Sequence, residues 1–256
     1  MAIAEHSRTL RDPVGRFHQT FRVMFTMVFG STSQCLAAAR QLHRRHQSIR
    51  GTMPETVGPV AKGSLYEAND LAALTWVYAT LVDSALLAYE LVLPPLTPEE
   101  REQCYSEGRT MAVLFGISRE SLPPNWSEFQ AYLDFMLQSD IVLVSPTARA
   151  IAHHLHAGTG SWLHPPFWYR SLTTHLLPPR LRQEFQFNYG AQEQRAATRA
   201  LRWLPRMYRT LPPAVRFVGP YREAQAKLAG KLRPSLAVRL SNRLWVGQSA
   251  LFNSGD

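Results

Sequence analysis

The sequence predicts an all-α fold, arranged as a single-domain helical bundle. Apolar residues recur at helical spacing along most of the chain, and residues typical of helix N-termini precede these segments. Strand signals, in contrast, are few and short. The chain has 256 residues, of which 45% are apolar, which is enough for one large core, and no internal repeat marks a second domain.

Local signals place the predicted helices in order. The first, over residues 13–29, follows the cap Asp12, begins with a proline and stops before Gly30. The second covers residues 32–50 and is closed by Gly51. The remaining helices are expected over residues 70–93, 98–115, 126–139, 146–158, 167–175, 179–209 with a break near 188–190, and 214–232.

Capping motifs support these boundaries. Thr97 and Glu100 have the spacing of a capping box around a proline at the first helical position, and Asn125 and Glu128 repeat that spacing. Residues 51–69 are rich in glycine, proline and polar side chains, so we expect a loop there. The short connections between helices are typical of compact helix packing.

The net charge of +9 is unevenly distributed along the chain. Residues 1–150 contain 13 Lys and Arg against 15 Asp and Glu, whereas residues 151–256 contain 15 against 4. Such a basic region suits an anionic membrane surface or an acidic partner, and a solvated face is the alternative. No nucleic-acid-binding module is recognisable, so we expect no nucleic-acid partner.

Other features indicate a cytoplasmic protein. Cys35 and Cys104 are far apart and match no metal or redox spacing, which favours two reduced thiols. Charged residues interrupt the N-terminus before any apolar run of signal-peptide length. The most apolar stretch, residues 71–96, contains Asp83 and Glu90, and a charge at mid-bilayer would cost ~3 kcal/mol. We therefore expect a buried helix there rather than a membrane span.

One histidine stands out on an apolar helix face. At about 100° per residue, His46 shares one side of its predicted helix with apolar residues on the turns before and after it. Burial there would favour the neutral imidazole, which is the form that binds metals. The alternative is a core histidine bound to a carbonyl group. The residues of this face are Cys35, Leu36, Ala39, Leu42, His46 and Ile49.

The preceding helix carries an arginine and a threonine on the flank of its own apolar stripe. Arg16 and Thr20 are four residues apart, so their side chains stack on one side and could reach the same space as His46. Tyr78, in the long apolar helix, is a further candidate for that space, with an ordinary core position as its alternative. The apolar stripe consists of Val14, Phe17, Phe21, Met24, Phe25 and Val28.

Several short motifs occur in a characteristic order and spacing. They are Arg16-x3-Thr20, Val28-Phe29-Gly30, His46-x2-Ile49-x-Gly51, Tyr66-Glu67-Ala68-Asn69-Asp70, Trp76 to Ser84, Tyr105-Ser106-Glu107, Leu122-Pro123 and Leu177 to Arg182. With these motifs in this order, the chain resembles the rubber-oxygenase (latex-clearing protein) family and its MpaB-type oxygenase relatives. The resemblance covers roughly residues 12 to 220.

This resemblance implies a globin-like core that binds haem b, with His46 as the axial iron ligand and Arg16 and Thr20 at the family's arginine and threonine positions. Arg50, beside His46, could pair with a haem propionate, as could Arg44 and Arg45. The chain would then be divided into an N-terminal tail (1–11), an MpaB/rubber-oxygenase-like catalytic domain (12–232) and a basic C-terminal tail (233–256).

The implied activity is a haem-dependent oxidoreductase, an oxygenase that uses O₂ on an apolar, unsaturated substrate of isoprenoid or lipid type. The chain departs from the family pattern at three points. Gln19 replaces the distal lysine, no glutamate base precedes the first helix at the expected distance, and Tyr78 stands where many relatives have histidine. The missing glutamate and lysine favour an alternative, a haem- or lipid-binding helical protein without turnover, whereas the retained Arg16, Thr20 and His46 favour the enzyme.

Two further features suggest other roles. His153, His154 and His156 could form part of a zinc site of a hydrolase, although no carboxylate or cysteine nearby completes it, and an exposed helix end is the alternative. In the tail, Leu236, Leu240 and Leu244 at i, i+4 spacing lie among arginines, as in a helix that lies on a membrane. Docking of that helix onto the protein's own core is equally compatible with the pattern.

Overall fold

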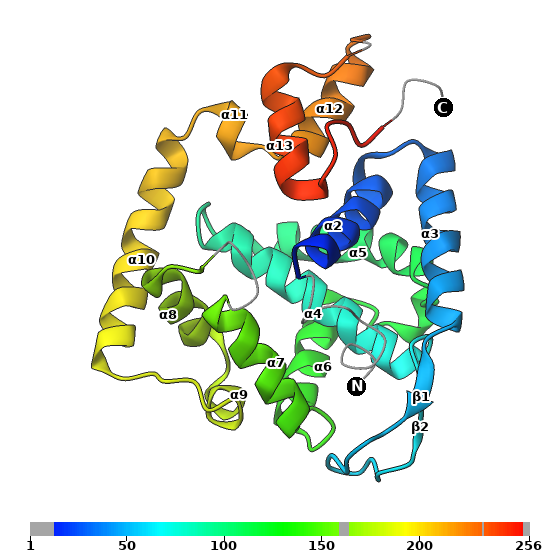
Figure 1. Cartoon of the computed structure of the whole chain (residues 1–256), viewed down its shortest axis with the longest axis vertical. Helices are drawn as coiled ribbons and strands as arrows, with labels where there is room; N and C mark the ends of the chain where they lie inside the picture. Colours follow the sequence, from blue (N-terminus) through cyan, green and yellow to red (C-terminus); the bar gives the residue numbers. More distant parts are fainter. Residues whose placement is uncertain (1–12, 159–163, 232, 253–256) are drawn as a thin grey trace. The chain divides into compact units, whose positions relative to one another are not determined.

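The computed structural model describes residues 13–158, 164–231 and 233–252, and most of these residues are helical (Figure 1). The all-α prediction is therefore confirmed. Asp12, the predicted first cap, lies outside the described residues. The chain divides into two compact units, which we describe separately. The terminal unit comprises residues 13–45 and 208–252, and the central unit comprises residues 46–207.

The terminal unit combines the two ends of the described chain. Its elements are α2 (Pro13–Phe29), α3 (Thr32–Gln47) up to Arg45, α11 (Pro213–Arg216), α12 (Gly219–Leu228) and α13 (Leu236–Val246). One continuous helix was predicted over 214–232, but the chain is extended at Phe217 and Val218. Pro220 explains the division, because proline fits the first turn of α12 but would break the hydrogen-bond ladder inside a longer helix.

Helix α13 packs on α2 and α12, as the adjacent blue, orange and red ribbons show (Figure 1). The ring of Trp245 lies 5.8 Å from that of Phe17, 5.3 Å from Phe21 and 6.1 Å from Phe25, measured between centroids. The aromatic stripe of α2 thus contacts the C-terminal helices. The tail helix was expected either to lie on a membrane or to dock onto the protein's own core. In the structure α13 is docked onto the protein, and one of its faces remains exposed.

Polar contacts fix the C-terminal end of α13. The His18 Nε2 atom lies 3.1 Å from the carbonyl oxygen of Leu244, and the Arg22 guanidinium donates to the carbonyl of Val246 at 3.3 Å. Helix C-termini carry carbonyl groups without intrahelical partners, so donors from α2 satisfy them. Gly247 follows with a φ of 70°, a left-handed conformation that glycine adopts without strain.

The central unit begins with a short antiparallel ribbon, β1 (Arg50–Thr52) and β2 (Leu65–Glu67), with Arg50 opposite Glu67. A loop was predicted for residues 51–69, and α3 was predicted to continue to residue 50. Each strand has only three residues, too few for an alternating pattern to stand out. Pairing between the two segments therefore takes Arg50 out of the helix.

Helices make up the rest of the central unit. They are α4 (Leu71–Glu90), α5 (Pro98–Leu114), the 3₁₀ turn η1 (Arg119–Ser121), α6 (Trp126–Gln138), α7 (Pro146–Ala157), α8 (Phe167–Leu176), α9 (Pro179–Glu184) and α10 (Ala191–Thr210) up to Met207. The predicted break near residues 188–190 separates α9 from α10. Two buried clusters join α4, α5 and α6, one around Tyr78 and one around Tyr105 and Phe129.

Helix α4 departs from its expected burial. Only 17% of its most apolar window is buried, and Val77 is 54% exposed. By length and composition, α4 is the one helix among the described residues that could cross a membrane. The prediction of a buried helix was wrong, because apolar composition indicates that a surface needs covering but not which part of the chain covers it.

Candidate functional site

His46 lies in the last turn of α3, and its side chain is half-buried. The chain turns back directly after it. The Ile49 amide donates to the carbonyl of His46 at 3.0 Å, and the Ala68 amide donates to the carbonyl of Ile49 at 2.9 Å. Two residues later, Asp70 caps α4 by accepting a hydrogen bond from the Ala73 amide at 2.8 Å. The β1–β2 ribbon thus joins the end of α3 to the start of α4.

The residues predicted to share the apolar helix face with His46 are buried to different degrees. Ala39 is buried, Leu42 and Ile49 are half-buried, and Leu36 is 41% exposed. Arg50 projects from the exposed side of β1, where its guanidinium is accessible to solvent. The His46 imidazole therefore has an apolar side and lies close in sequence to an accessible cation.

Tyr78 lies in the second turn of α4 and is only 5% exposed. Its ring packs with Ala112, Ile117 and Leu122, and its hydroxyl is directed at α5, where a Cβ on Gly108 would lie 3.1 Å from the oxygen. Burial raises the pKa of Tyr78 to about 12, so the phenol is protonated at neutral pH. Within the described chain, this hydroxyl has no hydrogen-bond partner.

Arg16 and Thr20 lie on α2 in the terminal unit, and both side chains are exposed. Loss of part of its hydration lowers the pKa of the Arg16 guanidinium although the residue is largely accessible, and the positive charge of Arg45 lowers this pKa further. Arg45 belongs to the last turns of α3, so the beginning of α2 faces the end of α3, as expected for two helices joined by the short connection at Gly30. Arg16 and Thr20 thus belong to one unit, whereas Tyr78 belongs to the other.

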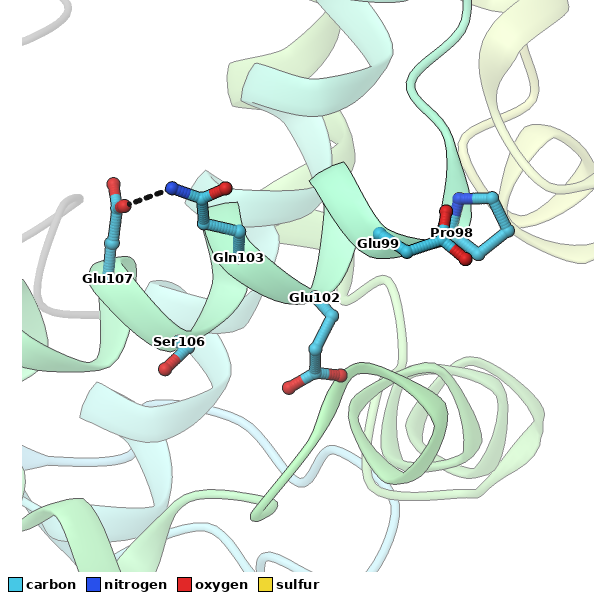
Figure 2. Close-up of a pocket in the computed structure, with 6 residues that line it drawn as sticks. All are labelled: Pro98, Glu99, Glu102, Gln103, Ser106 and Glu107. Atoms are coloured by element: carbon cyan, nitrogen blue, oxygen red, sulfur yellow. Dashed lines mark hydrogen bonds between the residues drawn. The ribbon is translucent and has the colours of Figure 1, made fainter.

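A surface hollow of about 720 Å³ lies along α5 (Figure 2). Glu102 accepts a hydrogen bond from the Trp126 amide at 2.8 Å, and Glu107 accepts one from Gln103 at 2.9 Å, as the dashed line in Figure 2 shows. These carboxylates are therefore engaged in helix contacts. The lining residues are Pro98, Glu99, Glu102, Gln103, Ser106 and Glu107, none of which the sequence had indicated as a site.

The histidines of α7 bind separate partners. The Nε2 atom of His153 lies 2.7 Å from the Phe185 carbonyl, whereas that of His156 lies 3.2 Å from the Arg170 carbonyl. Both rings pack on Phe187, with centroids 5.0 and 4.5 Å away. No group of three or more His, Cys, Asp or Glu side chains suited to a metal ion occurs in the part of the chain that the structure describes. The geometry favours a structural role for these imidazoles.

Comparison with known families decides the class of the protein. Residues 1–210 match the family model described as ER-bound oxygenase mpaB/B'/Rubber oxygenase, catalytic domain. The chain belongs to this family. The match confirms the resemblance noted in the sequence, and it ends at Thr210, the last residue of α10. The chain thus contains an oxygenase-family domain. Searches among curated proteins and among solved structures gave no match.

Several motifs that carry the family resemblance have structural roles. The Tyr105 hydroxyl donates to the Pro123 carbonyl at 2.7 Å. Arg180 donates to the carbonyl of Leu137 at the end of α6, at 2.7 Å from Nη2. Arg182 donates to the Thr174 carbonyl in the last turn of α8 at 3.0 Å. These three side chains hold helix ends and loops, so their place in the family motifs is explained by structure.

Proposed function

We propose that this chain is a haem b-dependent oxygenase that acts with O₂ on an apolar, unsaturated substrate of isoprenoid or lipid type. His46 is the axial iron ligand in this proposal. The main support is the oxygenase-family match over residues 1–210, combined with a half-buried imidazole at the motif position of the axial histidine. A cytoplasmic location is part of the same proposal, since the two cysteines of the sequence are far apart and match no metal or redox spacing.

The chemistry of the candidate side chains fits a haem. A neutral imidazole is a common iron ligand, and accessible guanidinium groups such as that of Arg50 bind carboxylates such as propionates. The partnerless hydroxyl of Tyr78 is a buried donor, and a buried polar group is costly unless it forms a hydrogen bond. A bound cofactor or substrate could provide the acceptor that the described protein atoms do not.

When bound, haem supplies the activation of O₂, and the protein supplies the ligand, the pocket polarity and the exclusion of water. His46 must present a deprotonated ring nitrogen to the metal. Arg16 and Thr20 enter the proposal through the family resemblance. The arginine would hold a propionate or stabilise negative charge near the group, and the threonine would donate a hydrogen bond.

A non-catalytic haem- or lipid-binding protein remains the second candidate. It is favoured by Gln19, whose neutral amide stands at the position of the family's distal lysine, and by the missing glutamate base. A lysine ammonium can lose a proton and then bind a metal through its amine lone pair, whereas the lone pair of the glutamine amide nitrogen is delocalised into the carbonyl group. O₂ consumption with polyenes, terpenoids and unsaturated fatty acids distinguishes the two candidates, because only the enzyme consumes O₂ in proportion to substrate.

An absorption spectrum tests the haem proposal directly. We expect the purified or hemin-reconstituted chain to show a Soret band that is lost or shifted in His46→Ala. The matched control is His43→Ala, which removes an exposed imidazole one turn earlier on the same helix and should leave the band unchanged. A folded chain that remains colourless after hemin addition, or an identical band in His46→Ala, would refute the assignment.

A further inference from the structure

The outer face of α13 presents a row of leucines to solvent. Leu236 is 74% exposed, Leu240 is 65% exposed and Leu244 is 55% exposed. Their spacing of four residues aligns them along one side of the helix. The opposite side is already occupied, because Val238, Asn242 and Val246 are buried against the rest of the terminal unit. The leucine row is therefore a second apolar face, which the described chain leaves uncovered.

Positive charge flanks this row without a compensating carboxylate. Arg239 and Arg243 are exposed and lie on one edge of the leucine row, as their positions on the helix require. Lys231 and Arg233 are exposed in the preceding turn. The sequence has no Asp or Glu from Ala224 to Gly255. The solvent-facing side of α13 therefore combines leucines with cations alone.

The nearest carboxylate in the sequence does not reduce this charge at the surface. Glu223 is only 2% exposed. Its Oε2 atom accepts hydrogen bonds from Asn242 Nδ2 at 2.6 Å and from the Leu251 amide at 2.9 Å, and its Oε1 atom accepts one from the Phe252 amide at 3.1 Å. The carboxylate thus holds the C-terminal segment from inside, away from the leucine face.

We propose that this face of α13 is a docking surface for an anionic lipid bilayer. Leucines inserted at the level of the acyl chains, with arginines at the phosphates, are the arrangement by which amphipathic helices lie on membranes. A second copy of the chain fits less well, because it would bring two sets of arginines together. The inference goes beyond the oxygenase proposal, since α13 lies outside the family match, and it holds whether or not the chain binds haem.

The structure presents this face without rearrangement. Trp245 packs on the phenylalanines of α2, and His18 and Arg22 satisfy the carbonyls at the end of α13. The helix is therefore formed and oriented before it meets a membrane. Binding then costs little ordering entropy, which is the main cost for a disordered tail that folds on a membrane.

Vesicle flotation of the full chain tests the proposal. We expect binding to vesicles of phosphatidylcholine mixed with phosphatidylglycerol, weak binding to phosphatidylcholine alone, and release at high salt. Arg239→Gln combined with Arg243→Gln should weaken binding about thirtyfold. Leu240→Ser combined with Leu244→Ser should weaken it on the order of tenfold or more. Circular dichroism establishes that each variant remains helical.

Controls use equally accessible residues elsewhere. Leu65→Ser changes a leucine that is 83% exposed on β2, and Arg202→Gln combined with Arg206→Gln removes two exposed cations from α10. Both controls should bind like the wild type. The proposal would be overturned if the wild-type chain did not bind to anionic vesicles. Undiminished binding by the leucine variant would also overturn it, and would point to the apolar face of α4. A wild-type dimer that dissociates only in the leucine variant would overturn it as well, because the leucine row would then bind a second copy of the chain.

Discussion

Tyr105 and Pro123 are joined by a 2.7 Å hydrogen bond from the phenol to the backbone carbonyl. Tyr105 is fully buried, whereas the equally buried hydroxyl of Tyr78 on the neighbouring helix has no partner among the described residues. We therefore expect different outcomes when the hydroxyl is removed from each tyrosine. Tyr105→Phe should lower the free energy of unfolding by roughly 1–2 kcal/mol, and Tyr78→Phe should change it little in the cofactor-free chain. Urea unfolding measures both.

The Tyr78 variant also reports on the proposed cofactor pocket. If a bound haem or substrate accepts a hydrogen bond from this hydroxyl, Tyr78→Phe should weaken hemin binding by roughly 1 kcal/mol, or about fivefold. Titration of hemin into the folded chain measures this effect. Equal affinity of the variant and the wild type would assign Tyr78 to the α4–α5 core alone.

The buried carboxylate of Glu223 should stabilise the folded position of the C-terminal segment. Glu223→Gln replaces an acceptor oxygen with an NH₂ group that faces other donors, so at least one buried amide loses its partner. We expect a loss of about 1–3 kcal/mol. Hydrogen exchange should show the loss first at Leu251 and Phe252. Glu193→Gln, at a solvent-exposed contact with the Gly190 amide, serves as the control and should have little effect.

Arg180 should not tolerate lysine. Its guanidinium donates to the carbonyls of Leu137 and Val142 and to the Glu184 carboxylate, which needs several donors in a planar arrangement. A lysine ammonium cannot reach all three in that geometry, and we expect Arg180→Lys to cost roughly 1.5–3 kcal/mol. Arg202→Lys, at an exposed position on α10, should be nearly neutral in the same thermal unfolding measurement. If Arg180→Lys were as stable as the wild type, these hydrogen bonds of Arg180 would not contribute to stability.

Stability should depend on pH through Asp83. Partial burial raises the pKa of this carboxyl group, and the nearby charge of Asp134 raises it further. A raised folded-state pKa means that the folded chain binds the proton more tightly, so this contribution is fully present below the unfolded pKa of ~3.9 and is lost as pH rises through the folded pKa. Asp83→Asn should therefore raise the melting temperature at neutral pH, with a gain that disappears in acid.

The charged neighbour that acts on Asp83 is Asp134 of α6, a like charge. A melting temperature of Asp83→Asn that is unchanged at neutral pH would mean that solvent screens this pair completely.

Much of the helical structure could be predicted because its signals are local. The Thr97 capping box is formed with both reciprocal hydrogen bonds, and Asn125 accepts from the Glu128 amide at 2.9 Å. Gly158 ends α7 in the left-handed conformation. Each of these features depends on residues within one turn, so the amino-acid order is sufficient to specify it.

The partial burial of His46 could be predicted in the same way. Helical periodicity placed His46 on the apolar side of α3, and the structure has it half-buried there. Periodicity could not predict that α3 ends before Arg50, because that depends on pairing with β2 fifteen residues later. It also could not show that the Tyr78 hydroxyl is directed at Gly108, since the approach of α4 and α5 depends on side chains from both helices.

The amino-acid sequence by itself determined the all-α class, the beginnings of most helices and the oxygenase family. Only the tertiary structure decided that α13 packs on α2, more than 200 residues away, that α4 keeps much of its apolar surface exposed, and that Glu223 is enclosed by amide donors. The physical reason is that caps and periodicity act over a few residues of one segment. Which apolar faces meet depends instead on the combined burial and hydrogen bonding of segments far apart in the chain.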